Sequence, residues 1–440
     1  QCATLEVPED PAKPQGRKIS LKVVRVASRA AEPLPDPVVY FAGGPGQSAS
    51  ESYAGLAGAF SRLREKRDLV FADQRGTGGS NPLACAIPEG FDAALEPTLE
   101  LQLRMARECL EALDADASQY TTTVAAGDTE ALRLALGAPK LNLYGGSYGT
   151  RMAQEYARQY PDAVRSIILD GVVPPALALG SEHAINLEAA LTRMFGRCSE
   201  QPGCAKAFGE PMRTLYALRD QARAAPVPVS TRDALSHAPR ELTLDETAVS
   251  SMARLFAYLP ETAALLPLLL DEAVNGRPES LVAQAALVFD SLSQQVSFGM
   301  QLSVVCAEDA PRMQVREQDK DLILGSSIVG VTLNQCGVWP RGPVSENFHQ
   351  PLVTDTPVLL LSGEDDPVTP PRYADTVLAS LGNARHLVGK GQGHILLTRG
   401  CTARLAAEFI DSLDPKALDA SCLDALGPTP FFTNHSGAEP

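Results

Sequence analysis

The fold of this chain is decided by residues 141–149, which read LNLYGGSYG. Residues 141–144 favour a strand, and a helical stretch, 150–160, follows the glycines and stops at Pro161. The pattern G-x-S-x-G between a strand and a helix is typical of a sharp turn. Such a turn holds a nucleophilic serine in strained backbone, above a helix amino terminus that favours negative charge. An ordinary glycine-rich turn is the alternative for the bare pattern. With its context, the motif predicts that Ser147 is a catalytic nucleophile.

The rest of the chain alternates short apolar runs with helical stretches in two regions. The runs that have the composition of strands are 19–27, 38–41, 69–72, 141–144, 166–169, 358–361 and 384–387. Short buried strands separated by helices favour a mostly parallel sheet that helices cover on both faces. Between the two regions the chain is rich in Leu and Ala and predicts helices alone. We therefore expect an α/β fold divided into core 1–175, helical cap 176–350, core 351–426 and exposed tail 427–440.

The composition restricts the kinds of partner. The formal net charge is −15, which argues against nucleic acid, because phosphate contacts need clustered Lys and Arg. An acidic surface weakly favours cationic substrates such as peptides with a free amino terminus. No stretch has the roughly 18 to 20 consecutive apolar residues of a membrane span. Neither metal-ligand spacing nor a dinucleotide signature occurs, so we expect no cofactor.

The cysteines indicate a disulfide framework. None of the nine forms a C-x-x-C pair, and eight fall into sequential pairs separated by short or moderate loops. We expect the disulfides Cys85–Cys109, Cys198–Cys204, Cys306–Cys336 and Cys401–Cys422, with Cys2 left over. Such bridges favour a secreted or periplasmic location, whereas nine buried thiols in a cytosolic enzyme are the alternative. The start at Gln1, without a basic and apolar leader, fits a mature protein whose signal peptide has been removed.

A serine nucleophile needs a histidine base and an acid that orients it, in the chain order serine, acid, histidine. Of six histidines, His394 has the expected position, in a glycine-rich loop shortly after the last apolar run. The acid should lie just beyond residues 358–361, where Glu364, Asp365 and Asp366 occur. We choose Asp366, with Asp365 as the alternative. The other histidines are expected to be structural or exposed: His183, His237, His349, His386 and His435.

The oxyanion of an acyl-transfer intermediate needs backbone N–H donors close to the serine. The turn 43–46, which reads GGPG, follows the apolar run 38–41 and allows the backbone to approach a substrate carbonyl closely. We predict that the Gly44 and Tyr148 amides are the donors. Asp73 and Arg75, at the end of the next run, are expected to brace the loops around the site.

These segments together resemble the proline iminopeptidase and tripeptidyl aminopeptidase family of α/β-hydrolases. The matching stretches are 43–48, 73–78, 145–150 and 169–172, and for the secreted tripeptidyl branch also 2–8, 366–370 and the Cys401 and Cys422 pair. One departure is Ala42, where proline iminopeptidases usually have His before the GGPG turn. It puts narrow proline specificity in doubt and favours the secreted branch. The resemblance implies a serine exopeptidase that releases one or a few residues from a free peptide amino terminus.

An aminopeptidase needs carboxylates that pair with the substrate ammonium. Glu308 and Asp309 are our candidates, because a bridge at Cys306 would hold two adjacent acids against the site, and a solvated acidic turn is the alternative. A carboxylesterase acting on small acyl esters would use the same triad. A secreted binding protein on a hydrolase scaffold is a third interpretation, which the intact set of serine, acid, histidine and oxyanion turn makes less favoured.

Overall fold

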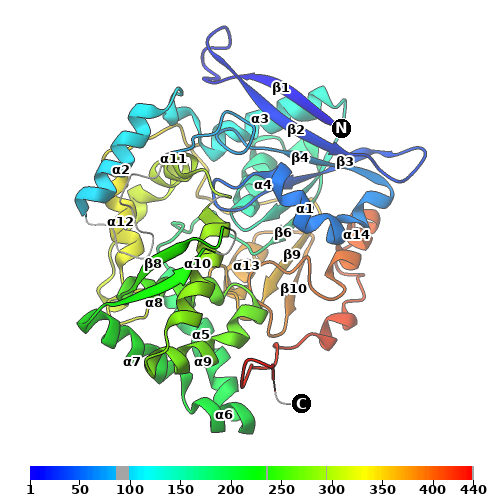
Figure 1. The fold of residues 1–440 in the computed structure, drawn as a ribbon. Coiled ribbons are helices and arrows are strands. Elements are labelled where there is room, and N and C mark those ends of the chain that lie inside the picture. Colours follow the sequence, from blue (N-terminus) through cyan, green and yellow to red (C-terminus); the bar gives the residue numbers. More distant parts are fainter. Residues whose placement is uncertain (86–98, 234–235, 294, 439–440) are drawn as a thin grey trace.

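The computed structural model describes residues 1–85, 99–233, 236–293 and 295–438, and an eight-stranded sheet lies at its centre (Figure 1). The strand order is β1-β2-β4-β3-β5-β6-β9-β10. The pairs β1–β2 and β2–β4 are antiparallel, and every other neighbouring pair is parallel, as predicted. The strands are β1 (Cys2–Pro8), β2 (Lys18–Val26), β3 (Leu34–Phe41), β4 (Arg67–Ala72), β5 (Leu141–Gly146), β6 (Val164–Asp170), β9 (Val358–Gly363) and β10 (Ala384–Gly389).

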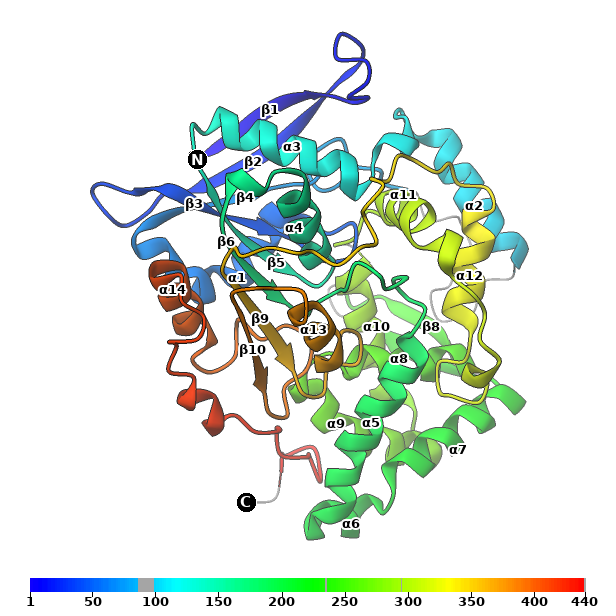
Figure 2. The same ribbon diagram turned by 180° about the vertical axis from the view of Figure 1, so that it is seen from behind.

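Helices cover both faces of the sheet. Successive residues of β9 alternate between two hydrophobic cores: Val358 and Leu360 belong to one core, Leu359 and Leu361 to the other. This alternation is the normal period of a strand, and burial on both sides explains the continuous apolar run. The first core includes residues of α3 (Thr122–Ala135), α4 (Tyr148–Gln159) and α13 (Pro371–Leu378), which lie in front of the sheet in Figure 2. The second includes residues of α1 (Ala49–Phe60) and α14 (Thr402–Ser412).

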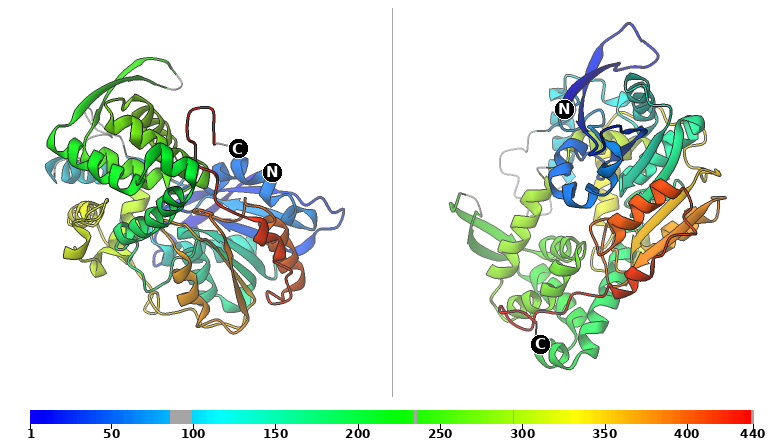
Figure 3. Two further views of the ribbon diagram at one scale, coloured as in Figure 1. Left: turned by 90° about the horizontal axis from the view of Figure 1, so that it is seen from below. Right: turned by 90° about the vertical axis from the view of Figure 1, so that its right-hand side faces the viewer.

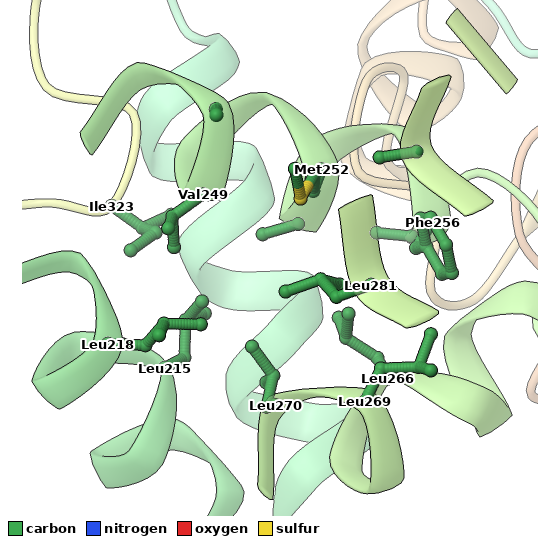
Figure 4. Packing of buried hydrophobic residues seen from close by; sticks show 14 of the residues in the cluster. Leu215, Leu218, Val249, Met252, Phe256, Leu266, Leu269, Leu270, Leu281 and Ile323 are labelled. Atoms are coloured by element: carbon green, nitrogen blue, oxygen red, sulfur yellow. The ribbon is translucent and has the colours of Figure 1, made fainter. Parts of the chain in front are cut away.

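The cap is inserted between β6 and β9, which are neighbours in the sheet. Its first part contains α5 (His183–Glu200), α6 (Pro202–Phe208), α7 (Pro211–Ala224), α8 (Glu246–Phe256), α9 (Pro260–Val274) and α10 (Glu279–Ser293). All of these helices except α6 contribute residues to a hydrophobic core within the cap, part of which is shown in Figure 4. The arrows of β9 and β10 point toward the cap in Figure 2, and Figure 3 shows it at one end of the sheet. The carboxyl ends of the parallel strands therefore face the cap.

The prediction of an all-helical cap is wrong in one element. Residues Val227–Arg232 and Pro239–Leu244 form an antiparallel hairpin, β7–β8. Its buried side chains, among them Val229, Leu242 and Leu244, join the core of the cap, whereas Ser230 and Glu241 are exposed. In β8 the apolar residues Leu242 and Leu244 alternate with polar ones, and this period of two is the sequence signal of the hairpin.

The later part of the insertion returns to the core. Helix α11 (Phe298–Glu308) places Met300 and Val304, four residues apart on one helical face, against Val7 and Tyr148 of the core. The disulfide Cys306–Cys336 joins α11 to α12 (Ser327–Cys336), and Cys85–Cys109 reaches α2 (Leu99–Ala112). All four predicted disulfides are confirmed, including Cys198–Cys204 and Cys401–Cys422, and Cys2 is free and exposed.

The carboxy-terminal tail is more closely packed than predicted. Phe431 is buried against Cys198, Cys204 and Ala264 of the cap, and the Phe432 amide donates a hydrogen bond to the Ala264 carbonyl at 3.1 Å. The aromatic side chains supply the apolar area that a tail needs in order to dock. In the described ranges no helix has the length and apolar character needed to cross a bilayer.

Candidate active site

Ser147 occupies the sharp turn between β5 and α4 that the sequence predicts. Its backbone has φ 54° and ψ −123°, a conformation that is costly for a residue with a side chain. A Cβ on Gly145 would lie 2.3 Å from the Gly149 oxygen, and one on Gly149 would lie 2.1 Å from the Phe41 oxygen. The two motif glycines are therefore required by close backbone packing. The Ser147 amide donates to the Asp170 carbonyl at 2.8 Å, which ties the turn to β6.

His394 and Asp366 are brought together from two loops at the carboxyl edge of the sheet. His394 Nδ1 lies 2.8 Å from Asp366 Oδ2. The other carboxylate oxygen, Oδ1, accepts hydrogen bonds from the Val368 and Thr369 amides, each at 2.8 Å. The Thr369 hydroxyl donates to Oδ2 at 2.7 Å and lies 3.1 Å from His394 Nδ1. The carboxylate thus has a fixed orientation toward the imidazole.

The two side chains shift each other's pKa in opposite directions. Burial disfavours the charged form of each group, so by itself it would raise the pKa of Asp366 and lower the pKa of His394. The charge of the partner and the hydrogen bond between them outweigh burial. The pKa of Asp366 is therefore lowered from 3.8, and the pKa of His394 is raised from 6.5.

Asp365, the alternative acid, has a different set of partners. Its carboxylate forms ion pairs with Arg193, at 3.3 Å, and with Arg197, both on cap helix α5. The structure therefore brings Asp366, and not Asp365, to His394, while Asp365 joins the core to the cap.

Two residues that support the histidine loop were not singled out from the sequence. Asp170, at the end of β6, is fully buried, and its carboxylate accepts hydrogen bonds from the Leu396 and Leu397 amides, each at 2.8 Å. The Tyr258 carbonyl accepts a hydrogen bond from the His394 amide at 2.8 Å, and the two rings meet edge to face at 5.3 Å. Because its carbonyl also holds Ser147, Asp170 links the serine turn to the histidine loop. The position of Asp170 at the carboxyl end of a strand is the sequence feature that could have identified it.

Ser147 and His394 line the same cavity, which has a volume of about 2240 Å³ and lies between the core and the cap. Within the described residues, no hydrogen bond joins the Ser147 hydroxyl to His394, and this pairing often tightens only when substrate is bound. Gly44 also lines the cavity and has φ +103°, where a Cβ would lie 2.7 Å from the Gly46 amide. Tyr148 is the first residue of α4, so its amide has no partner inside the helix.

Asp73 and Arg75 brace surrounding segments. Asp73 accepts hydrogen bonds from the Ser48 hydroxyl and the Ser50 amide, each at 2.8 Å, at the start of α1. Arg75 forms an ion pair with Asp128 of α3 at 2.7 Å. Both residues are buried, and neither lines the cavity.

A second serine, histidine and aspartate set lies within the core. His386 Nε2 lies 2.9 Å from the Ser362 hydroxyl, and His386 Nδ1 lies 2.8 Å from Asp375. Ser362 is 0% exposed, belongs to strand β9 and does not line the cavity. Consecutive hydrogen bonds alone therefore do not make a site, because a nucleophile also needs access to substrate.

Glu308 and Asp309 are buried beside Arg151 and do not line the cavity. Arg151 Nη1 lies 2.9 Å from Asp309 and 3.8 Å from Glu308. Glu308 accepts hydrogen bonds from the Thr122 amide at 2.7 Å and the Thr122 hydroxyl at 3.0 Å. Burial raises the pKa of Glu308 to about 8, so it is mainly uncharged at neutral pH. Their position favours a structural role over contact with a substrate ammonium.

This arrangement predicts unequal effects of the two amide substitutions on stability at pH 7. Asp309→Asn leaves the buried Arg151 charge uncompensated and is expected to lower the free energy of unfolding by about 3 kcal/mol. Glu308→Gln replaces a group that is already mainly neutral and is expected to cost less than about 1 kcal/mol. Urea unfolding of both variants at pH 7 measures the difference. Equal losses would show that Glu308 carries a charge in the folded protein.

Comparison with known proteins agrees with the fold. The family described as "alpha/beta hydrolase fold" matches residues 36–202, and the family described as "TAP-like protein" matches residues 324–422. The serine protease Hip1 of Mycobacterium tuberculosis is 26% identical over 91% of this chain and 82% of its own length. The tripeptidyl aminopeptidase of Streptomyces lividans is 33% identical over 40% of this chain and 36% of its own length.

A proline iminopeptidase of Neisseria gonorrhoeae is 28% identical over 31% of this chain and 32% of its own length. The two family matches cover both halves of the core, and the first of them includes the turn that carries Ser147. The chain is therefore a serine hydrolase of the α/β-hydrolase fold, and the relatives that it resembles are peptidases.

Proposed function

We propose that this protein is a serine exopeptidase that releases one or a few residues from the free amino terminus of peptides. The cavity that contains Ser147 and His394 carries this proposal. Its volume of about 2240 Å³ exceeds the roughly 300 to 1,000 Å³ of ordinary small-ligand pockets. That space suits a segment of peptide better than a small acyl ester. The aminopeptidases among the relatives support the same substrate class.

The proposed reaction runs through an acyl-enzyme intermediate. Ser147 Oγ attacks the scissile carbonyl while His394 Nε2 takes the hydroxyl proton, and Asp366 stabilises the imidazolium that forms. The Gly44 and Tyr148 amides donate to the oxyanion. The tetrahedral intermediate collapses, the C–N bond breaks, and His394 gives its proton to the leaving amine. Water then attacks the ester, with His394 again as base, and frees the acyl product and the serine.

A different acid takes the role of ammonium ligand in this proposal. The acids that line the cavity are Glu51, Glu241 and Glu246. Glu246 is paired with Arg223, at 2.7 Å from its Nε, and Glu241 accepts a hydrogen bond from Ser230 at 2.8 Å. In the described part of the chain no side chain pairs with the Glu51 carboxylate. Glu51 lies in the first turn of α1, shortly after the proposed oxyanion turn, and is free to bind a substrate ammonium.

Glu51→Gln is expected to raise KM for a free-amine peptide anilide by about 10-fold or more, because a charge-assisted hydrogen bond is lost. Steady-state kinetics on the anilide measures the change. Glu246→Gln is the matched control, since Glu246 lines the same cavity but is already neutralised by Arg223. If both variants had the same KM, Glu51 would not be the ammonium ligand.

Blocking the amino terminus tests the exopeptidase proposal itself. A free-amine peptide anilide should be hydrolysed, and its acetylated form should not be. Mass spectrometry of the products from a mixed peptide pool then gives the number of residues released. Equal turnover of both anilides, or turnover of acyl esters alone, would overturn the proposal, and the second result would favour the carboxylesterase.

We also propose a secreted or periplasmic location. The four disulfides support it, because disulfides form and persist in oxidising compartments.

A further inference from the structure

The charged side chains of the cavity are mostly neutralised by neighbours. The basic residues that line it are Arg240, Arg254, Lys320 and Arg399. Arg399 is paired with Glu261, Lys320 with Glu317 at 2.6 Å, and Arg240 has an interaction of its own. Arg254 is the remaining basic residue of this group, and it forms no ion pair with any described residue.

Among the residues that the structure describes, Arg254 has an aromatic neighbour but no acidic one. Its Nη2 donates to the Tyr258 hydroxyl at 3.0 Å, and its guanidinium lies 5.6 Å from the centre of the Tyr258 ring. Across the described ranges, no carboxylate lies within ion-pair distance of it. Val249, Met252 and Phe256 of the same helix, α8, are buried in the core of the cap (Figure 4), whereas Arg254 lines the cavity. Four of the five guanidinium N–H donors of Arg254 therefore have no acceptor in the described part of the chain.

The position of Arg254 relates it to the reacting groups. The Tyr258 ring, whose hydroxyl accepts a hydrogen bond from Arg254, lies 5.3 Å from the His394 ring, and the Tyr258 carbonyl accepts a hydrogen bond from the His394 amide. The positive charge of Arg254 disfavours protonation of His394 and of His183, another cavity residue. Burial lowers the pKa of His183 to about 3, so His183 stays neutral and supplies no competing charge. Arg254 is therefore a cation close enough to the proposed base to influence its charge.

In serine hydrolysis the histidine gives its proton to the leaving amine, so a group beside the histidine is in a position to meet the leaving part of the substrate. A guanidinium binds a carboxylate through parallel hydrogen bonds, and its geometry suits few other peptide groups as well. We propose that Arg254 binds a carboxylate of the leaving segment, and that the enzyme therefore prefers short peptides whose carboxyl terminus reaches this residue. The inference rests on the proposed exopeptidase function and adds a recognition site for the leaving product.

Pairs of alanine peptides, from two to five residues long, test this proposal. Each length is used as the free acid and as the carboxy-terminal amide, and kcat/KM is obtained from product formation by mass spectrometry. The wild-type protein should prefer the free acid by about 10- to 100-fold at one length, because Arg254 and Ser147 are a fixed distance apart. At that length, an amidated peptide ending in Asp shows whether a side-chain carboxylate serves as well as the terminal one.

Variants of Arg254 connect the preference to this side chain. Arg254→Gln should reduce the ratio of free acid to amide to within about 2-fold, and Arg254→Lys should keep part of it. Arg399→Gln is the matched control, because Arg399 lines the same cavity but is already paired with Glu261, and it should keep the wild-type ratio.

Two results would overturn the role of Arg254: no preference in the wild-type protein at any length, or an unchanged ratio in Arg254→Gln. The first result is obtained with the wild-type protein, so this test is valid even if a variant fails to fold. A free-amine peptide anilide, whose leaving group is neutral, separates this failure from failure of the proposed function. If the anilide is cleaved but no preference exists, the Arg254 inference alone is wrong. If no free-amine substrate is cleaved, the exopeptidase proposal is wrong.

Discussion

Alanine in place of Ser147 is expected to lower kcat for a free-amine peptide anilide by about 10⁶-fold. The hydroxyl is the atom that forms the proposed acyl-enzyme, so its removal leaves only substrate binding and oxyanion stabilisation. Ser147 contributes little else to the fold, because its hydroxyl makes no hydrogen bond to any described residue. Thermal unfolding should therefore change little while activity is lost.

Stopped assays at high enzyme concentration give the residual rate, and labelling with a fluorophosphonate reports the nucleophile directly. The matched control is Ser362→Ala, which removes the buried serine that is hydrogen-bonded to His386 in the second serine, histidine and aspartate set. That variant should still be labelled and should retain activity, because Ser362 has no access to substrate. Labelling of the Ser147→Ala protein, or loss of labelling in Ser362→Ala, would assign the nucleophile elsewhere.

Asparagine in place of Asp366 is expected to lower kcat by about 10⁴-fold, the second largest effect. The carboxylate holds the imidazole with its Nδ1–H toward Asp366, and the amide favours the wrong tautomer. The charge of Asp366 also raises the pKa of His394 above 6.5. Because the neutral imidazole is the base, activity rises as the pH passes upward through this pKa. Without the charge of Asp366, the rise in activity should occur at lower pH. The pH dependence of kcat/KM measures this shift.

Asp365→Asn is the control for this substitution, since it has the same chemistry one residue away. Asp365 is paired with Arg193 and Arg197 of the cap, so loss of its charge should lower the stability of the protein. The pH at which kcat/KM rises should not change. An inactive Asp365→Asn protein together with a normal Asp366→Asn protein would reverse the assignment of the acid.

The serine turn and the parallel core were predictable because their signals are local. A strand, two glycines that flank a serine, and a helix follow each other within twenty residues, and only glycine fits where Gly145 and Gly149 meet neighbouring backbone. Sequential spacing was also enough for the disulfides, since each bridge closes a loop of moderate length. The hairpin β7–β8 was missed because two short strands in a Leu-rich and Ala-rich region give a weak alternation.

The environment of charged residues depended on contacts between distant segments. Glu308 and Asp309 have the composition of an exposed acidic turn, yet both are buried beside Arg151, more than 150 residues earlier in the chain. The same applies to Asp365 and Asp366, which are adjacent in sequence but face a cap helix and His394 respectively. Neither spacing nor residue type distinguishes such neighbours.

By itself, therefore, the sequence determined the class of fold, the serine in its turn, the cysteine pairs and the histidine that follows the last strand. Backbone geometry and short-range packing decide these features, and both restrict the residue types at neighbouring positions in the sequence. Tertiary structure alone decided which acid meets His394, that Asp170 joins the serine turn to the histidine loop, and that Arg254 lines the cavity with no acidic partner among the described residues. Burial and electrostatics act between segments that only the folded sheet and cap bring together.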